Sequence, residues 1–246
     1  MTMTTEGRYL YCVTEETSAG FGKIGLAGKE VFGVVHKDIA AIVSPIPFKT
    51  IESTLATIMA HQQVVEACRT RATTLPVRFG VIFKNEEGVK EMLTKSYGSY
   101  RTKLLELRDK EEFGAKLILD EAGLKKIRAE VEGESDELAK LRKEMEKASK
   151  GTLYLLKIKM DEALKNETAR RIGELSGAVH RELGKASLES TLLKSEHEQI
   201  VLNGAYLVDT SRRDEFQSEA SKVKRKYEGQ GLSVHVSGPW APYSFC

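Results

Sequence analysis

Two apolar seams run through the most highly charged part of this sequence and constrain its fold more than any other feature. Residues 120–150 contain 17 charged side chains among 31. Within them, and again after Gly151, apolar residues recur at intervals of three and four. The seams consist of Leu138, Leu141, Met145 and Ala148, and then of Leu153, Leu156, Met160, Leu164, Thr168, Ile172, Leu175, Val179 and Leu183. Narrow apolar seams with charged outer faces predict two long helices paired as an antiparallel hairpin.

The segments that flank this hairpin have strand character. We expect strands at Phe113–Leu119, Glu189–Lys194, Gln199–Asp209 and Gly231–Ser237, and a helix at Arg212–Glu228. The resulting order is that of a split βαβ unit. We therefore predict an α+β fold of two domains. In the second, residues 111–237 form a modified ferredoxin-like antiparallel sheet with a long α-helical hairpin insertion and both helical elements on one face.

Residues 1–110 predict a separate N-terminal α+β domain. The expected strands are Arg8–Thr14, Val31–His36, Ile39–Ser44 and an edge or irregular strand Thr73–Phe83. The expected helices are Ile51–Arg71 and Glu86 to about Asp109. The two residues Lys37 and Asp38 predict a tight hairpin, and Asn85 is the predicted N-cap of the second helix.

The first of these helices has an apolar periodicity of its own. We expect Ile51, Leu55, Ile58, Met59 and Val65 to share the face that packs on the core.

The last nine residues, 238–246, are predicted to form a Pro- and aromatic-rich tail. Pro239 and Pro242 argue against a sheet ladder or a helix, whereas Trp240, Tyr243 and Phe245 need burial. A tail that folds back onto the body meets both demands, and we favour it over capture of the tail by a partner.

Composition and charge narrow the classes of function. Hydrophobic residues make up 41% and charged residues 30% of the chain, which predicts a globular protein. No apolar stretch is long enough for a membrane span, and residues 1–9 lack the pattern of a secretory signal, so we expect a cytoplasmic protein. A net charge of +2 gives little attraction for nucleic acid or for an anionic membrane. We expect neither as a partner.

The sequence Gly20-Phe-Gly22-Lys-Ile-Gly25 matches the GxGxxG pattern of nucleotide sites. In such sites the glycines lead into a helix whose N-terminus binds phosphate. The residues after Gly25 have strand character and include Gly28 and Gly33, which disfavour a helix. We therefore favour a flexible loop, and a nucleotide-dependent enzyme using Gly20–Gly25 stays open as the alternative function.

Other catalytic or metal-binding patterns are missing from the sequence. The five histidines show no paired ligand spacing. His61 and Cys68 are seven residues apart on one predicted helix, about 10 Å along its axis, which is too far to share a metal. Three scattered cysteines predict inert thiols. We expect no enzyme, no cofactor, no metal site and no small-molecule substrate.

Three segments carry a resemblance to a known family. They are Leu75-Pro-Val-Arg-Phe-Gly80, Ala205-Tyr-Leu-Val-Asp209 and Gly238-Pro-Trp-Ala-Pro-Tyr-Ser-Phe245. In this order they resemble the LPxRFG, YLVD and GPWPPYSF-like elements of the gas vesicle protein F/L family, and the similarity extends over essentially the whole chain. Ala241 departs from the usual second proline but leaves the aromatic residues intact.

The resemblance implies a minor or accessory protein of the gas vesicle, a gas-filled proteinaceous organelle for buoyancy. Members of this family are thought to bind the small hydrophobic wall protein A and to help nucleation by keeping it from aggregating. The implied partners are this wall protein and other gas vesicle accessory proteins, and the implied location is the gas vesicle within the cytoplasm.

The expected contact surface is an open sheet edge or the groove between the domains near Arg78, Phe79 and Trp240. For Arg78 a buried ion pair with an acid between the domains is an equal alternative. The candidate residues for protein contact or for packing between domains are Arg78, Phe79, Gly80, Trp240, Pro242, Tyr243 and Phe245.

Overall fold

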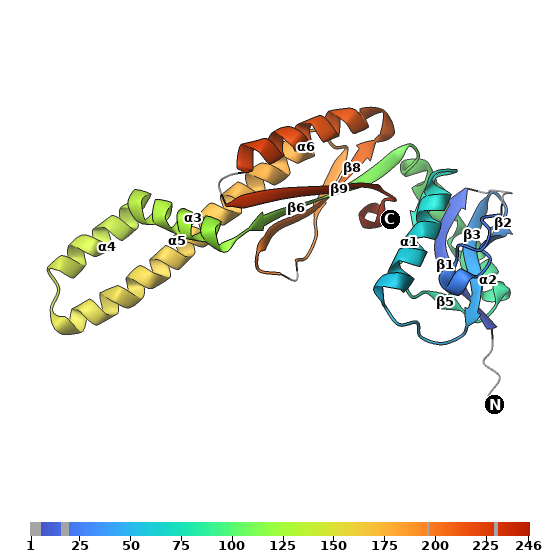
Figure 1. The fold of residues 1–246 in the computed structure, drawn as a ribbon, viewed down its shortest axis with the longest axis horizontal. Helices are drawn as coiled ribbons and strands as arrows, with labels where there is room; N and C mark the ends of the chain where they lie inside the picture. The colour runs from blue at the N-terminus through green and yellow to red at the C-terminus, as the bar shows by residue number, and fades with distance from the viewer. Residues whose placement is uncertain (1–5, 16–19, 196, 229–230) are drawn as a thin grey trace. The chain divides into compact units, whose positions relative to one another are not determined.

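The computed structural model describes residues 6–15, 20–195, 197–228 and 231–246, and its fold combines helices with antiparallel sheets, as predicted (Figure 1). Contacts between Cα atoms divide the chain into two compact units. Unit 1 comprises Met1–Glu112, Asp209–Ser211 and Gly238–Cys246, and unit 2 comprises Phe113–Val208 and Arg212–Ser237.

Unit 1 is built on a sheet with the strand order β2-β3-β1-β4, in which β5 also pairs with β1. The pairs between its strands are antiparallel. The predicted hairpin is present, and Lys37 takes a positive φ of 55° in its turn. The strands are β1 (Glu6–Glu15), β2 (Phe32–His36), β3 (Ile39–Pro47), β4 (Thr74–Pro76) and β5 (Ile82–Phe83).

The predicted edge or irregular strand Thr73–Phe83 is two short strands, of which β4 lies at the edge of the sheet. Pro76 has no N–H for a ladder. Gly80 has a φ of +95°, a conformation that an extended strand does not contain. The residues between the two strands therefore leave the sheet before Ile82 pairs again with Tyr9.

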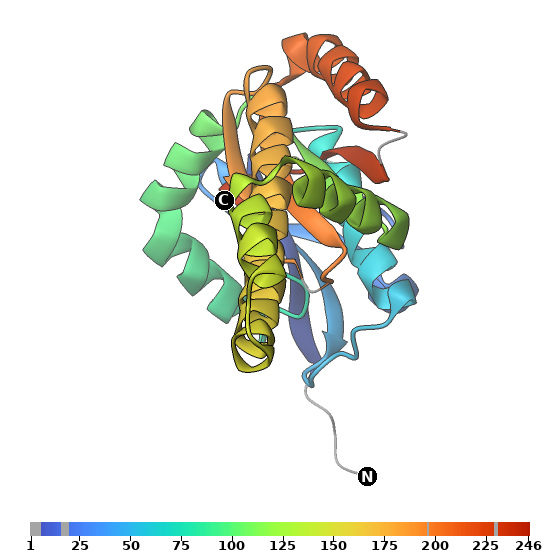
Figure 2. The same ribbon diagram turned by 90° about the vertical axis from the view of Figure 1, so that its left-hand side faces the viewer.

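Two helices cover opposite faces of this sheet, α1 (Leu55–Arg69) and α2 (Glu86–Glu106) (Figures 1 and 2). Each begins at a side-chain cap. The hydroxyl of Thr54 accepts the N–H of Thr57, and Oδ1 of Asn85 accepts that of Gly88, as predicted for Asn85.

The predicted inward face of the first helix is wrong over its first two turns. Leu55, Ile58 and Met59 are exposed. The buried residues of α1 are His61, Val64, Val65 and Cys68. At about 100° per residue, the side of the helix that holds these four is not the side that holds Leu55 and Met59. The apolar pattern therefore marks two surfaces, one of which faces solvent.

Unit 2 contains the second sheet, with the strand order β7-β8-β6-β9. Tyr206 on β8 contacts the ring of His180 on α5 and that of Phe216 on α6, so the two helices share one face of the sheet. The elements are β6 (Lys110–Leu119), α3 (Glu121–Glu134), α4 (Asp136–Glu146), α5 (Lys150–Gly184), β7 (Glu189–Leu192), β8 (Ile200–Asp209), α6 (Arg213–Tyr227) and β9 (Leu232–Trp240).

The predicted helical hairpin is present (Figure 1), but its first arm is two helices rather than one. Ser135 ends α3 and caps α4, because its hydroxyl accepts the N–H of Leu138 over 3.3 Å. Ser149 caps α5 in the same way, so Gly151 lies inside α5 and does not separate the arms. No helix in the described part of the chain combines the length and apolar character that a membrane crossing needs.

The structure also corrects the prediction for the tail. β9 continues through Pro239 to Trp240, and Tyr243–Phe245 form a short 3₁₀ helix, η3. Because β9 lies at the edge of its sheet, the missing N–H of Pro239 costs it no ladder partner.

Candidate functional site

The segment Leu75–Gly80 is tied to the core of unit 1 by a chain of hydrogen bonds. Gly80 donates its N–H to the hydroxyl of Tyr9 over 3.1 Å, and that hydroxyl lies 2.9 Å from Nδ1 of His61. Since the Tyr9 oxygen accepts from Gly80, its own proton is available to His61. The ring of Phe79 packs edge-on against those of Tyr9 and His61, with centroids 6.0 and 5.9 Å away. Phe79 and Gly80 therefore attach this segment to the core residues Tyr9 and His61.

Burial governs the ionisation of this cluster. It lowers the pKa of His61, and the backbone of Val77 opposes that shift in part. It raises the pKa of Tyr9 to about 12. A neutral His61 that accepts at Nδ1 carries its proton on Nε2, which is buried without a hydrogen-bond partner of ordinary geometry among the described residues. The cluster therefore favours a neutral imidazole.

Arg78 differs from its neighbour Phe79, whose ring packs in this cluster. It is exposed, and it forms no ion pair with any residue that the structure describes. The expectation of a buried arginine paired to an acid is therefore wrong. A buried guanidinium needs a partner to offset its desolvation, whereas an exposed one is solvated by water.

The tail residues lie against α1 and the start of β6 within unit 1. Tyr243 donates its hydroxyl to Oε1 of Gln62 over 3.1 Å. Ser244 donates both its N–H and its hydroxyl to the carboxylate of Glu112, over 2.7 and 2.9 Å. Burial raises the pKa of Glu112, and the bonds from Ser244 oppose the shift. Phe245 is buried at 7% exposure.

A pocket of about 320 Å³ opens beside this contact and is lined by Gln62, Glu112, Trp240 and Tyr243. Trp240 keeps 38% of its surface exposed, whereas Pro242 is buried. Of the predicted site residues the structure brings Trp240 and Tyr243 together here. Arg78, Phe79 and Gly80 do not line this pocket.

The exposed face of α1 is the feature that sequence reasoning missed. Leu55, Ile58 and Met59 are 75%, 44% and 62% exposed. Gln62 follows them at helical spacing, so the exposed face leads toward the pocket. No charged residue occurs from Ser53 to Val65. That absence was a usable signal, because the solvent side of an amphipathic surface helix normally carries charges.

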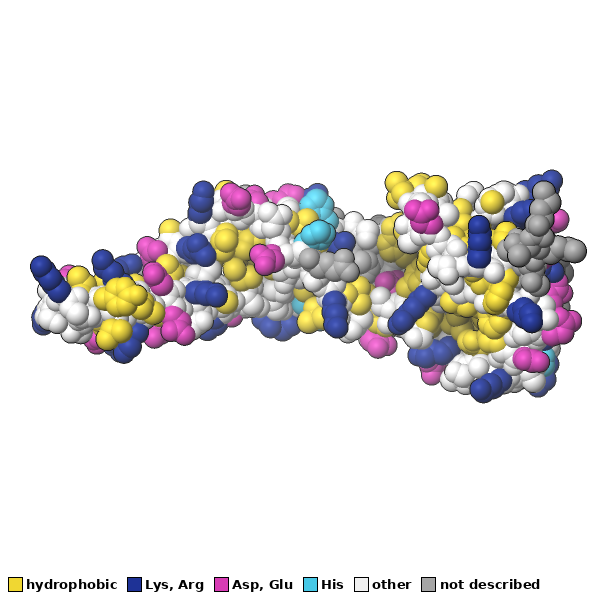
Figure 3. Space-filling view, turned by 90° about the horizontal axis from the view of Figure 1, so that it is seen from below, with side chains coloured by type: hydrophobic (Ala, Val, Ile, Leu, Met, Phe, Trp, Pro, Cys, Tyr) yellow, Lys and Arg dark blue, Asp and Glu magenta, His cyan; other side chains and the backbone are white. Residues whose placement is uncertain are grey.

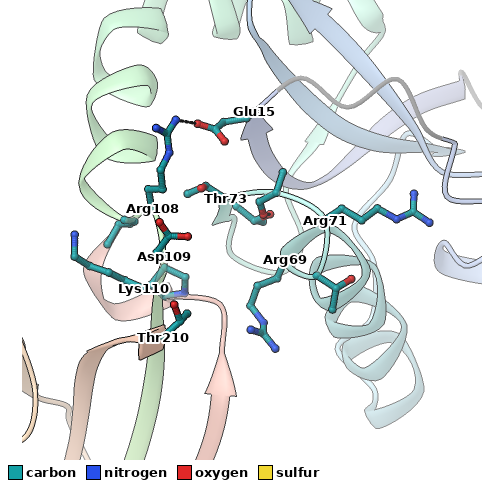
Figure 4. A pocket seen from close by; sticks show the side chains of 13 residues that line it. Glu15, Arg69, Arg71, Thr73, Arg108, Asp109, Lys110 and Thr210 are labelled. Carbon is teal, nitrogen blue, oxygen red and sulfur yellow. Dashed lines mark hydrogen bonds and ion pairs between the residues drawn. The ribbon is translucent and has the colours of Figure 1, made fainter. Parts of the chain in front are cut away.

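A second pocket, of about 340 Å³, lies in unit 1 and is rich in cations (Figure 4). Each of its three arginines already forms an ion pair or a hydrogen bond within the protein. Arg108 forms an ion pair with Glu15, and Arg69 forms one with Glu66 over 2.9 Å. Arg71 donates to the carbonyl of Gly20 over 3.2 Å. Figure 4 shows Arg69 and Arg71 directed away from Arg108, so the three do not converge on one anion.

The Gly20–Gly25 segment lacks the geometry of a phosphate loop. The predicted loop Gly20–Gly25 leads into a three-residue 3₁₀ helix, η1 (Leu26–Gly28). The N–H of Gly25 binds the carbonyl of Lys29 over 2.9 Å, and that of Leu26 binds the hydroxyl of Tyr11 over 2.8 Å. Amides that bind phosphate at a helix N-terminus must be unpaired.

In the part of the chain that the structure describes, no three His, Cys, Asp or Glu residues are placed to hold a metal ion. Cys12 and Cys68 are buried and Cys246 is exposed. Although Cys246 as a residue is exposed, its thiol is partly buried where it donates to the carbonyl of Pro242, and this desolvation raises its pKa to about 12. A thiol with a raised pKa is a poor nucleophile.

Comparisons with known proteins agree on one family. The chain is 25% identical to gas vesicle protein L1 of Halobacterium salinarum, with 98% of this chain and 90% of the relative covered. It is 29% identical to gas vesicle protein F of a Streptomyces species, with 91% of each covered. The crystal structure of GvpF from Anabaena superposes with a TM-score of 0.83 at 20% identity over 98% of both chains. The family described as gas vesicle synthesis protein GvpL/GvpF matches residues 7–246, and the chain belongs to that family.

Proposed function

We propose that this protein is an accessory factor of gas vesicle assembly that binds the hydrophobic wall protein A, assists nucleation of the vesicle and keeps the wall protein from aggregating. Membership of the family supports a role in gas vesicle formation. The wall protein as partner, the nucleation step and the location at the vesicle are our inference.

The exposed face of α1 is the observation that carries this proposal. Leu55, Ile58 and Met59 are exposed at spacings of three and four residues, and each contributes about 1.5–3 kcal/mol if a partner buries it fully. An apolar surface of this kind on a globular protein indicates an interaction site. Because no charged side chain interrupts it, the surface suits an uncharged apolar client rather than a charged one.

The pocket beside Gln62 extends this surface. Trp240 and Tyr243 supply aromatic area at its wall, and aromatic residues are enriched where interfaces are strongest. We define the client surface as Leu55, Ile58, Met59, Gln62, Trp240 and Tyr243.

Aggregation of the wall protein tests the proposal. Purified wall protein is diluted from denaturant into buffer with and without this protein, and light scattering and co-sedimentation are recorded. We expect the protein to suppress scattering and to remain bound to the wall protein. The triple variant Leu55→Ser/Ile58→Ser/Met59→Ser, and separately Trp240→Ala, should weaken both effects.

A matched variant controls for loss of apolar surface in general. Tyr154→Ser/Leu155→Ser/Ile158→Ser removes three exposed apolar side chains of α5 and should leave suppression unchanged. Arg78→Ala tests the surface favoured by the sequence and should also behave as wild type. If the wild-type protein neither binds nor suppresses, the function is wrong. If the α1 variant is folded and as active as wild type, the surface is wrong.

We also infer that the two units are separate domains and that unit 2 is a modified ferredoxin-like domain with the helical hairpin as an insertion. The order of elements, with α3 to α5 between β6 and β7, supports this, as does the strand order β7-β8-β6-β9. Limited proteolysis tests it. We expect cleavage first near Ser211 or Gly238, where the chain passes from one unit to the other.

A further inference from the structure

The α4–α5 end of the helical hairpin carries an unusual concentration of positive charge. Residues 140–159 contain seven Lys or Arg and two Glu, whereas the whole chain has a net charge of only +2. We name this region the hairpin end. Its basic residues are all exposed, and they are Lys140, Arg142, Lys143, Lys147, Lys150, Lys157 and Lys159.

Most of this charge has no internal counter-charge. Among the residues that the structure describes, only Arg142 of the seven forms an ion pair, with Glu132 over 3.8 Å. Surface helices of this chain otherwise pair many of their cations, as Arg170 does with Glu167 and Glu174. The lysines of the hairpin end therefore repel one another, and an acidic partner would relieve that repulsion.

The same region exposes a compact apolar cluster. Tyr154, Leu155 and Ile158 on α5 are 68%, 60% and 49% exposed. At about 100° per residue they lie on the side of α5 opposite to Leu156 and Ala163, which are buried. Figure 3 shows hydrophobic side chains framed by Lys and Arg at this end of the hairpin. The fold leaves both the apolar and the basic groups to solvent.

We propose that the hairpin end is a docking surface for an acidic amphipathic segment of a partner protein, with apolar side chains of that segment on Tyr154, Leu155 and Ile158 and its carboxylates on the surrounding lysines. This interaction is separate from the client surface on α1, where no charged residue occurs. It gives the chain two contact surfaces of different chemistry.

Charge on the flanks favours a protein partner over an anionic membrane. Glu144 and Glu146 interrupt the cations of α4, and Asp161 and Glu162 follow the apolar cluster on α5. At helical spacing Glu162 shares the face of Ile158. The apolar surface from Tyr154 to Ile158 therefore spans about one and a half turns. That length suits a crossing helix, whereas an anionic lipid surface would meet these carboxylates as well.

A defined peptide tests the proposal with the full chain. The probe is a fluorescein-labelled helical peptide of about 18 residues with Leu on one face and Glu on the other, and its binding is followed by fluorescence anisotropy. We expect saturable binding that weakens by about tenfold or more when salt is raised from about 0.05 to about 0.5 M. A peptide of equal length with Lys in place of Glu should not bind.

Two variants separate the apolar and charged contributions. Tyr154→Ser/Leu155→Ser/Ile158→Ser and Lys150→Glu/Lys157→Glu/Lys159→Glu should each weaken binding about tenfold or more, as expected for residues at the centre of an interface. The charge variant should also lose the salt dependence. Circular dichroism confirms that each variant retains its helices.

Matched controls carry the same changes elsewhere. Leu188→Ser/Leu192→Ser/Leu193→Ser removes three exposed apolar side chains that belong to neither contact surface, and Lys23→Glu/Lys29→Glu/Lys49→Glu makes the same change in net charge at exposed sites in unit 1. Both should bind the peptide as wild type does. If either control weakens binding as much as the variants of the hairpin end, the binding is nonspecific and the proposal fails.

Two other occupants are distinguished in the same experiment. Binding to vesicles that contain anionic lipid, lost in both variants of the hairpin end while the peptide shows no binding, would replace the protein partner by a membrane. Residues 130–137 contain five acidic and no basic side chains, so a second copy is also tested. Concentration-dependent dimerisation abolished by Lys150→Glu/Lys157→Glu/Lys159→Glu would assign the surface to self-association and overturn the proposal.

Discussion

The hydroxyl of Tyr9 lies 2.9 Å from Nδ1 of His61 and joins strand β1 to helix α1 inside the core of unit 1. Tyr9 is fully buried and His61 is 4% exposed. The same hydroxyl accepts the N–H of Gly80. Two polar groups from distant parts of the chain, the buried imidazole of His61 and the partly buried N–H of Gly80, therefore depend on one oxygen atom.

Tyr9→Phe removes that oxygen and leaves both groups without their partner. Leaving a buried polar group without its hydrogen bond destabilises the folded state by about 1–3 kcal/mol. We therefore expect the free energy of unfolding to fall by that amount, and urea denaturation measures it. The control is Tyr154→Phe on α5, where the ring is 68% exposed and the change should stay within about 0.5 kcal/mol. Equal effects of the two substitutions would contradict the role of the Tyr9 hydroxyl.

The buried imidazole makes unit 1 sensitive to acid. Burial lowers the pKa of His61 in the folded state below its usual value of about 6.5. Above that value His61 is neutral in both states, and its stabilising contribution is complete. As the pH falls below it, the unfolded chain binds a proton that the folded protein does not, so the free energy of unfolding decreases.

The difference in unfolding free energy between wild type and His61→Gln isolates this effect. Other titrating groups, such as Glu112 and His180, are present in both proteins, so their contributions to the pH dependence cancel in the difference. We expect the difference to narrow between about pH 7.5 and about pH 5.5, by no more than about 1.4 kcal/mol for each pH unit. Urea denaturation at several pH values measures it. A difference that is constant or that widens in acid would show that His61 accepts a proton in the folded state.

The backbone of Gly80 has a conformation that would be strained in a residue with a side chain. Its φ is +95°, and a Cβ built there meets nothing within 4 Å, so conformation rather than space decides the outcome. We expect Gly80→Ala to lower the free energy of unfolding by about 1 kcal/mol or more. Gly98→Ala, at an open position inside α2, should raise it by about 0.5–1 kcal/mol. Thermal unfolding of both variants checks the opposite signs.

The order of helices and strands was predictable from the sequence, because the apolar residues of each segment recur with the period of a helix or of a strand. The strands, the α2 cap at Asn85 and the arms of the helical hairpin are each marked by the residues of their own segment. The break at Ser135 was also within reach, since a serine followed by Asp136 and Glu137 is a typical helix start. The apolar seam continues across it, and that continuity favoured one helix.

The client surface was harder to predict because periodicity identifies an apolar stripe but not what covers it. Leu55 and Met59 have the spacing of core residues, and only the position of α1 on the sheet leaves them exposed. The pocket at Gln62 requires contacts between residues 181 positions apart, as in the bond from Tyr243. Arg78 lies within a segment whose neighbours are structural, and its sequence context did not indicate exposure.

A close approach of two backbones in unit 2 gives the last prediction. Gly123, in the first turn of α3, packs against Gly231, and a Cβ on Gly123 would lie 2.3 Å from the carbonyl oxygen of Gly231. Backbone cannot yield as a side chain does, so Gly123→Ala should lower the free energy of unfolding by about 1–3 kcal/mol, despite the better helix propensity of alanine. Gly133→Ala is the matched control, since it lies in the same helix in open space and should be neutral or stabilising. Urea denaturation of the two variants decides the matter. If Gly123→Ala is as stable as Gly133→Ala, then α3 does not contact the segment before β9, and the start of the helical hairpin is not anchored to the sheet as described.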